Sequence, residues 1–294
     1  MPKIDQKPVI GIIGGSGIYE IDGLKESRWE NVTSFFGNAS DKLLFGKLGK
    51  QELVFLPRHG RGHRIPPSKI NFRANIDVLK RAGVTKILSL SACGSLREKL
   101  SPGTFVIVDQ FIDRTFARVK SFFGEGLVAH VSFGEPVCSY LCNCLEQTLN
   151  TLNVPHQKGG TYLAMEGPQF STLAESKLYR SWGCDVIGMT NMPEAKLARE
   201  AEICYASVAM VTDYDCWHPN HDNVSVDTVI KALSANADRA REVIKNVVPN
   251  LSTSSDSCTQ GCASALEHAI ITQSEARDPE MIKKLRYVAG RLIN

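Results

Sequence analysis

The stretch Val9-Ile10-Gly11-Ile12-Ile13-Gly14-Gly15-Ser16-Gly17 combines a short β-branched run with a glycine-rich end. This pattern predicts a buried strand that enters a tight loop. Similar units recur at residues 53–56 and 85–90, each followed by a loop, and a helix is predicted over Phe72–Arg81 with Gly83 as its stop. Strands that alternate with helices indicate an α/β fold, in which helices flank a central, mostly parallel mixed β-sheet.

The overall composition is that of an ordinary globular protein. The chain has 294 residues, of which 43% are hydrophobic and 22% are charged. We expect a single domain over residues 1–250, followed at 251–294 by a polar linker and a helical tail that packs on the same domain. One amphipathic helix is predicted over residues 279–292, with Met281, Ile282, Leu285, Val288 and Leu292 on one face.

The charge distribution excludes several classes of partner. The formal net charge is +3, and the basic residues are scattered along the chain. Neither a nucleic-acid partner nor a membrane surface is therefore indicated. No apolar stretch is long enough for a membrane span, so we expect a cytoplasmic protein whose nine cysteines are reduced thiols.

Several predicted strands end in residues that suit an anion. The Gly14–Gly17 loop can turn its backbone N–H groups toward an anion, although a simple tight turn has equal weight. Arg58 and His59 follow another strand, and arginine can hold phosphate bidentately, whereas the alternative is a solvated basic loop. Ser91 and Thr190 also stand at predicted strand ends, where their hydroxyls can add donors. Together these residues indicate a site for free phosphate.

Metal binding is not predicted. His59 and His63 lie four residues apart in a glycine-rich loop, without the helix or the flanking carboxylate of a zinc protease. Cys142 and Cys144 fall within a predicted helix, Cys258 and Cys262 lie in the polar tail, and no paired CxxC arrangement occurs. We expect the cysteines to pack in the core or to be exposed without a role.

Asp213 and Asp215 give the sharpest chemical signal. Two residues apart at a strand end, they are expected to project from one side of an extended backbone. Repulsion in a partly buried pocket would raise the pKa of one carboxyl group, which could then donate a proton near neutral pH. A helix N-cap and a divalent metal site are the alternatives, with half the weight between them.

Read together, the motifs carry a resemblance. They are Gly14-Gly15-Ser16-Gly17, Arg58-His59-Gly60-Arg61, Ser91-Ala92-Cys93-Gly94, Glu166-Gly167-Pro168 and Thr212-Asp213-Tyr214-Asp215. This set, in this order and over about residues 9–250, resembles the trimeric branch of the purine nucleoside phosphorylase family, and within it the members that act on methylthioadenosine. The resemblance implies a nucleoside phosphorylase-like fold and a homotrimer or a dimer of trimers.

The resemblance also implies an activity and roles for residues. The activity is phosphorolysis of 5′-methylthioadenosine to adenine and 5-methylthioribose 1-phosphate in purine and methionine salvage, with phosphate as co-substrate and no cofactor. Catalytic roles fall to Asp213, as acid to the purine, and Asp215. The resemblance assigns phosphate to Ser16, Arg58, His59, Ser91, Ala92 and Thr190, and the nucleoside to Phe170, Met189, Thr212, Val226, Val229, Ile230 and, from a neighbouring subunit, His130.

Three positions depart from the family pattern, and three other activities stay open. Ser16 and Ser91 stand where threonine is common and keep the hydroxyl, whereas Gln169 stands where arginine is common and loses a charge beside Phe170. The alternative activities are phosphorolysis of adenosine or another purine nucleoside, hydrolytic nucleoside cleavage, and binding of adenine nucleosides without turnover.

Overall fold

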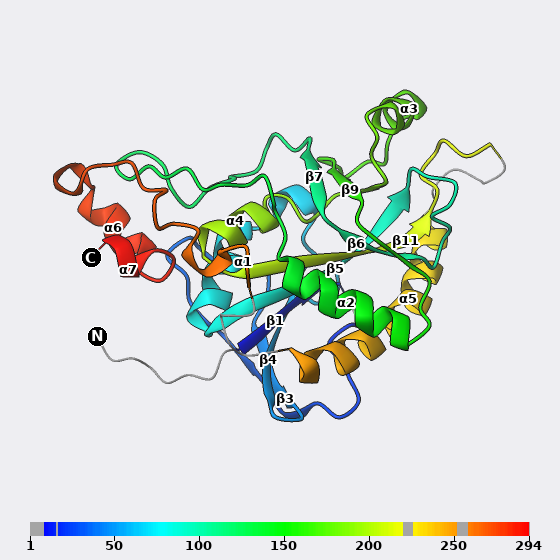
Figure 1. The fold of residues 1–294 in the computed structure, drawn as a ribbon, viewed down its shortest axis with the longest axis horizontal. Helices are drawn as coiled ribbons and strands as arrows, with labels where there is room; N and C mark the ends of the chain where they lie inside the picture. Colours follow the sequence, from blue (N-terminus) through cyan, green and yellow to red (C-terminus); the bar gives the residue numbers. More distant parts are fainter. Residues whose placement is uncertain (1–8, 16, 220–225, 252–257, 294) are drawn as a thin grey trace.

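The computed structural model describes residues 9–15, 17–219, 226–251 and 258–293, and for 226–231 and 233 it describes the backbone alone. Its centre is an 11-stranded sheet (Figure 1). Four strands form the parallel middle of this sheet: β4 (Gln51–Pro57), β1 (Val9–Gly14), β5 (Val84–Ser95) and β11 (Cys204–Asp213). Every residue of β1 is buried, as the apolar run at residues 9–13 predicts.

The remaining strands extend the sheet on both sides. Beyond β4 lie β3 (Leu43–Leu48) and β2 (Lys25–Glu30), both antiparallel to their neighbours. The other strands are β6 (Phe105–Val108), β7 (Gln110–Asp113), β8 (His156–Lys158), β9 (Thr161–Ala164) and β10 (Val186–Gly188). Six strand pairs are parallel and four are antiparallel, which confirms the predicted mostly parallel mixed sheet.

Strand β5 is longer than the sequence predicts, and this length shapes the site. β1 accompanies it only to the pair Ile13↔Ser89, after which β5 continues to Ser95 and pairs with β10 at Gly94↔Ile187. The prediction that this strand ends at Leu90 is therefore wrong. β11 stays hydrogen-bonded to β5 beyond that point, with Ala209 opposite Ser91, so the extra residues keep a strand partner on one side.

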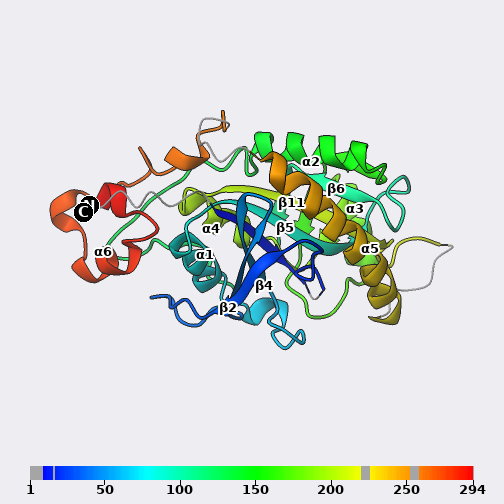
Figure 2. The same cartoon turned by 90° about the horizontal axis from the view of Figure 1, so that it is seen from below.

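Helices cover both faces of the sheet. The pair α2 (Ser139–Thr151) and α5 (Val226–Val247) packs side by side on one face, and α1 (Phe72–Arg81) with α4 (Glu194–Glu200) lies on the other (Figure 2). The predicted bounds of α1 are confirmed. A capping box starts α3 (Leu173–Ser181), where Thr172 and Glu175 exchange hydrogen bonds.

The tail forms two short helices where one is predicted. These are α6 (Pro279–Leu285) and α7 (Gly290–Ile293), which follow the one-turn helices η4 (Cys262–Ser264) and η5 (Ser274–Ala276). The prediction of one helix over 279–292 is wrong, and the weak helix former Gly290 stands where the second helix begins. Leu266, Leu285 and Val288 are buried in the same apolar cluster as the central strands.

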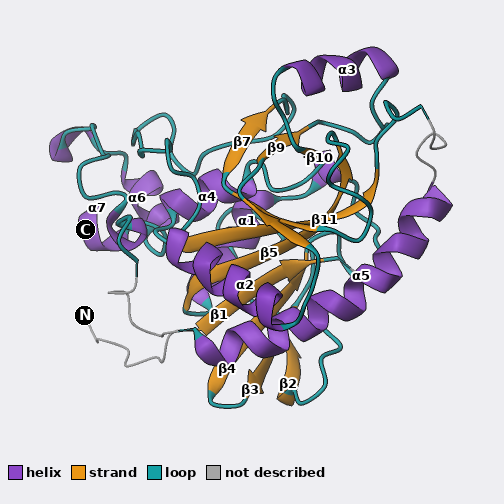
Figure 3. Ribbon diagram, turned by 45° about the vertical axis from the view of Figure 1, so that its right-hand side comes forward, coloured by secondary structure: helices purple, strands orange, loops and turns teal. Residues whose placement is uncertain are grey.

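The tail helices and α3 lie at opposite ends of the molecule. The tail helices lie near α1 and α4, whereas α3 projects at the far end of the sheet, near β7, β9 and β10 (Figure 3). Among the described helices, none is both long and apolar enough to cross a membrane.

Candidate active site

The predicted anion loops are neighbours in the structure. Gly14 at the end of β1 lies opposite Pro57 at the end of β4, and the Arg58 N–H donates to the Gly14 carbonyl at 3.0 Å. Ser16 lies outside the described residues. Its neighbour Gly17 is held from α5, because Arg241 Nη1 donates to the Gly17 carbonyl at 2.6 Å. Parallel strands therefore deliver the glycine loop and the basic loop to one edge.

Arg58 is buried and already holds a carboxylate. Its Nε and Nη2 donate to the two oxygens of Glu194 at 2.8 and 3.1 Å, Nη2 also donates to Ser89 Oγ, and Nη1 donates to the Leu90 carbonyl at 3.0 Å. Burial alone disfavours both charges, but Glu194 raises the pKa of Arg58 and Arg58 lowers that of Glu194. The two-pronged face of Arg58 that is predicted to bind phosphate therefore binds Glu194. A guanidinium has five N–H groups, and in Arg58 only one of them, on Nη1, remains for a ligand.

One ring nitrogen of His59 is held by a backbone carbonyl. Burial lowers its pKa to about 4, so the imidazole is neutral at pH 7. Its Nδ1 lies 2.9 Å from the Ile65 carbonyl, and because a carbonyl only accepts, Nδ1 carries the proton. The ring stacks on His63 with centroids 4.2 Å apart. Nε2 is therefore an acceptor, suited to the O–H of a monoprotonated phosphate.

The part of β5 that continues beyond the end of β1 carries the next residues predicted to bind an anion. Ser91 Oγ is buried and has no hydrogen-bond partner among the described residues. The N–H of Ala92 points to the same strand edge as the Leu90 carbonyl, because backbone groups two residues apart face the same side. Thr190 is also buried, two residues beyond the end of β10. An unused hydroxyl such as that of Ser91 suits an anion better than a dry packed core.

Asp213 and Asp215 are close, although not as the sequence predicts. β11 ends at Asp213, and Asp215 has a φ of 53°, in the left-handed region, so the two residues do not share one side of an extended strand. The Asp215 N–H turns back and donates to Asp213 Oδ1 at 2.8 Å. This is an Asx turn, in which a side chain replaces the next strand partner. A structural role therefore accompanies whatever chemistry the pair performs.

The electrostatics of this pair favour a retained proton. Burial raises the pKa of Asp213, hydrogen bonds from Thr212 Oγ1 and the Asp215 N–H partly oppose the rise, and the charge of Asp215 adds to it. Burial also raises the pKa of Asp215, against the opposing effect of the Ser176 and Ser171 hydroxyls. Among the residues that the structure describes, Asp215 Oδ2 is buried and has no hydrogen-bond partner. One carboxyl can thus donate a proton while the other offers an unused acceptor.

A second hydrogen-bonded cluster fixes the loop that carries Phe170. Glu166 accepts hydrogen bonds from Ser68 Oγ, from the N–H groups of Phe116 and Ala117, and from Arg118 Nε. Although burial alone raises its pKa, these donors lower the pKa of Glu166 to about 2, so the carboxylate is charged at any working pH. The cluster therefore ties three segments that are distant in the sequence.

The predicted nucleoside residues take different positions around this loop. Gly167 packs on Met189, because a Cβ added to the glycine would meet Met189 Sδ at 2.5 Å. Phe170 and Gln169 are exposed. The glutamine that stands in place of the family's arginine therefore removes a charge from the surface and not from the protein interior. Thr212 is buried and donates to the Cys93 carbonyl or to Asp213. Val226, Val229 and Ile230 begin α5, and their side chains lie outside what the structure describes.

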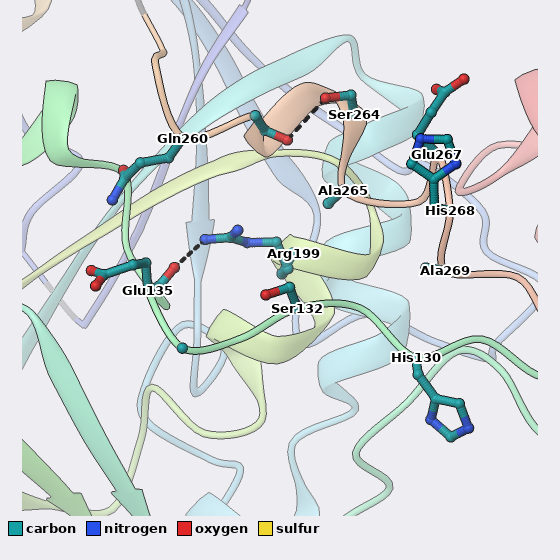
Figure 4. A pocket seen from close by; sticks show the side chains of 12 residues that line it. His130, Ser132, Glu135, Arg199, Gln260, Ser264, Ala265, Glu267, His268 and Ala269 are labelled. Atoms are coloured by element: carbon teal, nitrogen blue, oxygen red, sulfur yellow. Dashed lines mark hydrogen bonds between the residues drawn. The ribbon is translucent and has the colours of Figure 1, made fainter.

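His130 lies at a different place from the other predicted residues. Its N–H donates to the Ala269 carbonyl at 2.8 Å, and its exposed ring stands at the rim of a pocket between Arg199 and the tail segment 260–269 (Figure 4). Arg199 Nη2 donates to the Glu135 carbonyl across this pocket. Within the described chain, His130 thus accompanies tail residues, and a role in a neighbouring subunit's site stays a prediction.

The sequence does not predict two features of the structure, which are the contact of Glu194 with Arg58 and the meeting of four cysteines. Glu194 starts α4 and accepts from Arg58, Ser89 and Tyr205, residues that no local spacing connects to it. Cys138, Cys204 and Cys262 are buried, as the sequence allows, but the fold also gathers their sulfurs and that of Cys258 within 4.8 Å of one another. Their separation along the chain hides this cluster from any motif search.

Comparison with known proteins places this geometry among its relatives. Residues 9–249 match the model of a family described as the phosphorylase superfamily. The S-methyl-5′-thioadenosine phosphorylase of Rhodospirillum rubrum is 61% identical over 293 residues and covers 100% of both chains.

Solved structures show the same likeness in three dimensions. A methylthioadenosine phosphorylase sourced from an Antarctic soil metagenomic library has a TM-score of 0.90 and 45% identity, covering 96% of this chain and 99% of its own. A variant of the adenosine/methylthioadenosine phosphorylase of Schistosoma mansoni, solved in complex with methylthioadenosine, has a TM-score of 0.79 and 38% identity, covering 83% and 91%.

Proposed function

This chain belongs to the phosphorylase superfamily, and from that membership we propose that it is a pentosyltransferase that cleaves S-methyl-5′-thioadenosine with inorganic phosphate. The products are adenine and 5-methylthioribose 1-phosphate, which feed purine and methionine salvage. Phosphate is the co-substrate, and the reaction needs no cofactor.

One observation carries the proposal: strand β5 joins the anion residues to the aspartates. Ser91, with its unused hydroxyl, and Gly94 lie three residues apart on this strand. A Cβ added at Gly94 would lie 2.9 Å from Asp213 Oδ1. A phosphate and a purine that use these two places would therefore lie on either side of one ribose, which is the arrangement that phosphorolysis requires.

Phosphate acts as the nucleophile at C1′ of the sugar. It is held by the Gly14–Gly17 loop, the remaining Arg58 N–H, His59 Nε2, Ser91 Oγ, the Ala92 N–H and Thr190. As the bond from C1′ to N9 lengthens, the sugar becomes cationic, and the negative phosphate stabilises that charge while it approaches.

The aspartates act on the departing base. Asp213, whose pKa is raised, gives its proton to N7 of the purine, so adenine leaves as a neutral molecule. Asp215 accepts a hydrogen bond from the 6-amino group through its unpartnered Oδ2. A 6-oxopurine presents an acceptor there, and a site built to pair such groups discriminates by about 10⁴-fold or more.

The 5′-methylthio group lies at the start of α5. Val226, Val229 and Ile230 have the i, i+3, i+4 spacing that places residues on one helix face, which would present an apolar surface to the sulfur. An apolar pocket rejects an added hydroxyl by only about 10²-fold. Adenosine is therefore expected to react slowly.

The proposed assembly is a homotrimer or a dimer of trimers in the cytoplasm. Two features of the described chain support it. Phe116, next to the Glu166 cluster, is 83% exposed and the nearby Val119 is 58% exposed, so this loop offers apolar surface that a partner subunit could cover. His130 is also exposed and free to reach a neighbouring site.

Release of the free base, which is adenine from methylthioadenosine or adenosine and hypoxanthine from inosine, tests the function. Purified protein is given methylthioadenosine, adenosine or inosine, each with and without phosphate. We expect fast release from methylthioadenosine, slower release from adenosine and negligible release from inosine, all dependent on phosphate. Release without phosphate would identify a hydrolytic nucleosidase, and tight binding without release would identify a binding protein. Either result would overturn the proposal.

A further inference from the structure

Four cysteines meet at a place that the proposed reaction does not use. The sulfur atoms of Cys138, Cys204, Cys258 and Cys262 all lie within 4.8 Å of one another, and those of Cys138 and Cys258 are 3.7 Å apart. Three of the four are buried, and Cys258 is partly buried. All four are free thiols in the structure. Core packing alone gives no reason for four polarisable sulfurs to converge on one point.

Rigid elements supply two of the four sulfurs. Cys138 is the N-cap of α2, and its N–H donates to the Tyr205 carbonyl at 2.8 Å. Cys204 is the first residue of β11. The helix start and the central strand thereby fix these two residues relative to each other. Metal ligands need such rigid support.

The tail supplies the other two sulfurs through a tight turn. Gly261 has a φ of 63°, a left-handed conformation that lets the chain reverse between Cys258 and Cys262. Gln260 in the same turn accepts a hydrogen bond from the Ser139 N–H in the first turn of α2. The turn is thus held against the helix start that carries Cys138.

The geometry points to a tetrahedral zinc site, and we propose that Cys138, Cys204, Cys258 and Cys262 together bind one Zn²⁺ ion. A Zn–S distance of about 2.3 Å places the sulfurs of a tetrahedron about 3.8 Å apart. The observed 3.7 Å between Cys138 and Cys258 agrees with this value. Four thiolates with no open position are typical of structural zinc sites, in contrast to the three protein ligands of a catalytic one.

The charge around the cluster suits a thiolate centre. Four thiolates around Zn²⁺ carry a net charge of −2, and the four protons of the thiols pass to solvent as the metal binds. Lys86 is buried in β5 directly opposite Cys204, so a cationic side chain belongs to the neighbouring strand. Arg199, also buried, exerts its positive charge on Cys262. The N-terminus of α2 adds a partial positive charge at Cys138.

The proposed zinc has a structural consequence. It would link residues 258–262 of the tail to β11, the strand that ends at Asp213. The metal lies at the opposite end of that strand from the aspartates, so it would stabilise the docked tail and take no part in phosphorolysis. Its loss should therefore change stability far more than it changes kcat.

Metal analysis of the full-length protein tests the site. The protein is expressed with zinc in the medium, purified without chelator, and measured by elemental mass spectrometry. We expect about one zinc per chain, and about one zinc released when a mercurial reagent titrates the thiols. Cobalt substituted for zinc should give the intense visible bands of tetrahedral thiolate coordination.

Variants in the tail connect the metal to these residues. Cys258→Ser and Cys262→Ser lie outside the sheet and the long helices, and circular dichroism checks that they fold. Each should weaken the affinity for zinc at least about tenfold, measured by competition with a chromophoric chelator. The matched control is Cys184→Ser, because Cys184 is buried in a separate cluster and should leave the zinc affinity unchanged.

Three results would overturn the proposal. They are a wild-type protein without stoichiometric zinc, zinc that persists in the Cys258→Ser, Cys262→Ser double variant, and disulfides among these four cysteines found by mass spectrometry under non-reducing conditions. Iron in place of zinc would overturn the assignment of the metal. None of these results depends on catalytic activity, so the zinc site and the proposed function can fail separately.

Discussion

At the scale of single residues, Asp213 offers the most direct test of the proposed chemistry. The single side-chain oxygen of asparagine can still accept from the Asp215 N–H, and its amide group faces the Thr212 hydroxyl, but asparagine cannot donate an acidic proton. Asp213→Asn should therefore lower kcat about 10²- to 10⁴-fold while the KM for methylthioadenosine changes little. Steady-state kinetics measure both values. Exposed Asp22→Asn serves as the control, and a wild-type kcat in Asp213→Asn would remove this residue from the mechanism.

The pH profile gives a second readout of the same proton. Because burial raises the pKa of Asp213, the acid stays protonated above the usual aspartate range and loses its proton as the pH rises through that raised value. kcat/KM of the wild-type protein should fall on this alkaline side. The Asp213→Asn variant should lack this limb of the profile, since it has no proton to lose at that position.

Arg58 should matter for stability as well as for phosphate. Arg58→Ala leaves Glu194 buried with its charge unpaired, which typically costs about 3–5 kcal/mol of unfolding free energy. Urea denaturation measures this loss. The control is Arg28→Ala, because Arg28 pairs with Glu30 on the surface and its removal should cost about 1 kcal/mol or less. Equal losses in the two variants would show that the Glu194 pair is not a buried charge pair in solution.

The sequence predicts these residues unequally. Asp213 and Asp215 stand out because they are neighbours in the chain, and Arg58 because it follows a strand. Glu194 cannot be found in this way, since 136 residues separate it from Arg58 and only the folded sheet brings them together. The turn at Asp215 is also hidden, because a left-handed backbone is uncommon for aspartate.

At the scale of elements, Gly94 tests how β5 positions the acid. A Cβ at this position would lie 2.9 Å from Asp213 Oδ1 and 3.2 Å from Ile187 Cγ2, so the carboxyl group must move. Gly94→Ala should lower kcat by about 10²-fold, the size expected when a catalytic group shifts by about 1 Å. The control is Gly124→Ala, where an added Cβ meets nothing within 4 Å. Unchanged kinetics in Gly94→Ala would contradict the placement of Asp213.

Local signals account for which element bounds the sequence predicts. α1 and α3 begin at side-chain caps, and each has a left-handed glycine just beyond its end, so their bounds follow from neighbouring residues. The end of β5 depends instead on β11 and β10, which continue to pair with it. Such long-range pairing overrides local preference, as is common in sheets. The same limit applies to the short strand β8.

At the scale of the whole molecule, the tail and the sheet are expected to unfold together. Leu285 in α6 is fully buried in the apolar cluster of the central strands. Leu285→Ala should lower the unfolding free energy by about 2–5 kcal/mol, the usual range for a buried leucine. Tryptophan fluorescence and circular dichroism should report one shared transition. Two separate transitions would show that the tail is an independent unit, and exposed Leu178→Ala in α3 is the control.

Global stability should also depend on Glu200. Burial raises its pKa to about 7, although the Phe122 N–H and the Ser121 hydroxyl donate to it. A raised folded pKa adds stability below the unfolded value near 4.5, and this contribution disappears as the pH rises through 7, by about 3 kcal/mol. Denaturation at pH 5 and pH 8 measures the difference. Glu200→Gln should reduce it, and an unchanged difference would contradict the raised pKa.

The Arg58–Glu194 pair has a consequence for how a nucleophile behaves here. Because the guanidinium is already neutralised by a buried carboxylate, an incoming anion meets dipoles and hydroxyls more than net positive charge. A phosphate oxygen bound there is then not polarised toward a strong cation. Its electron pair stays available for donation to the ribosyl carbon in the proposed reaction. The pocket would thus bind the anion less tightly than an unpaired arginine would, but the bound anion would be a better nucleophile.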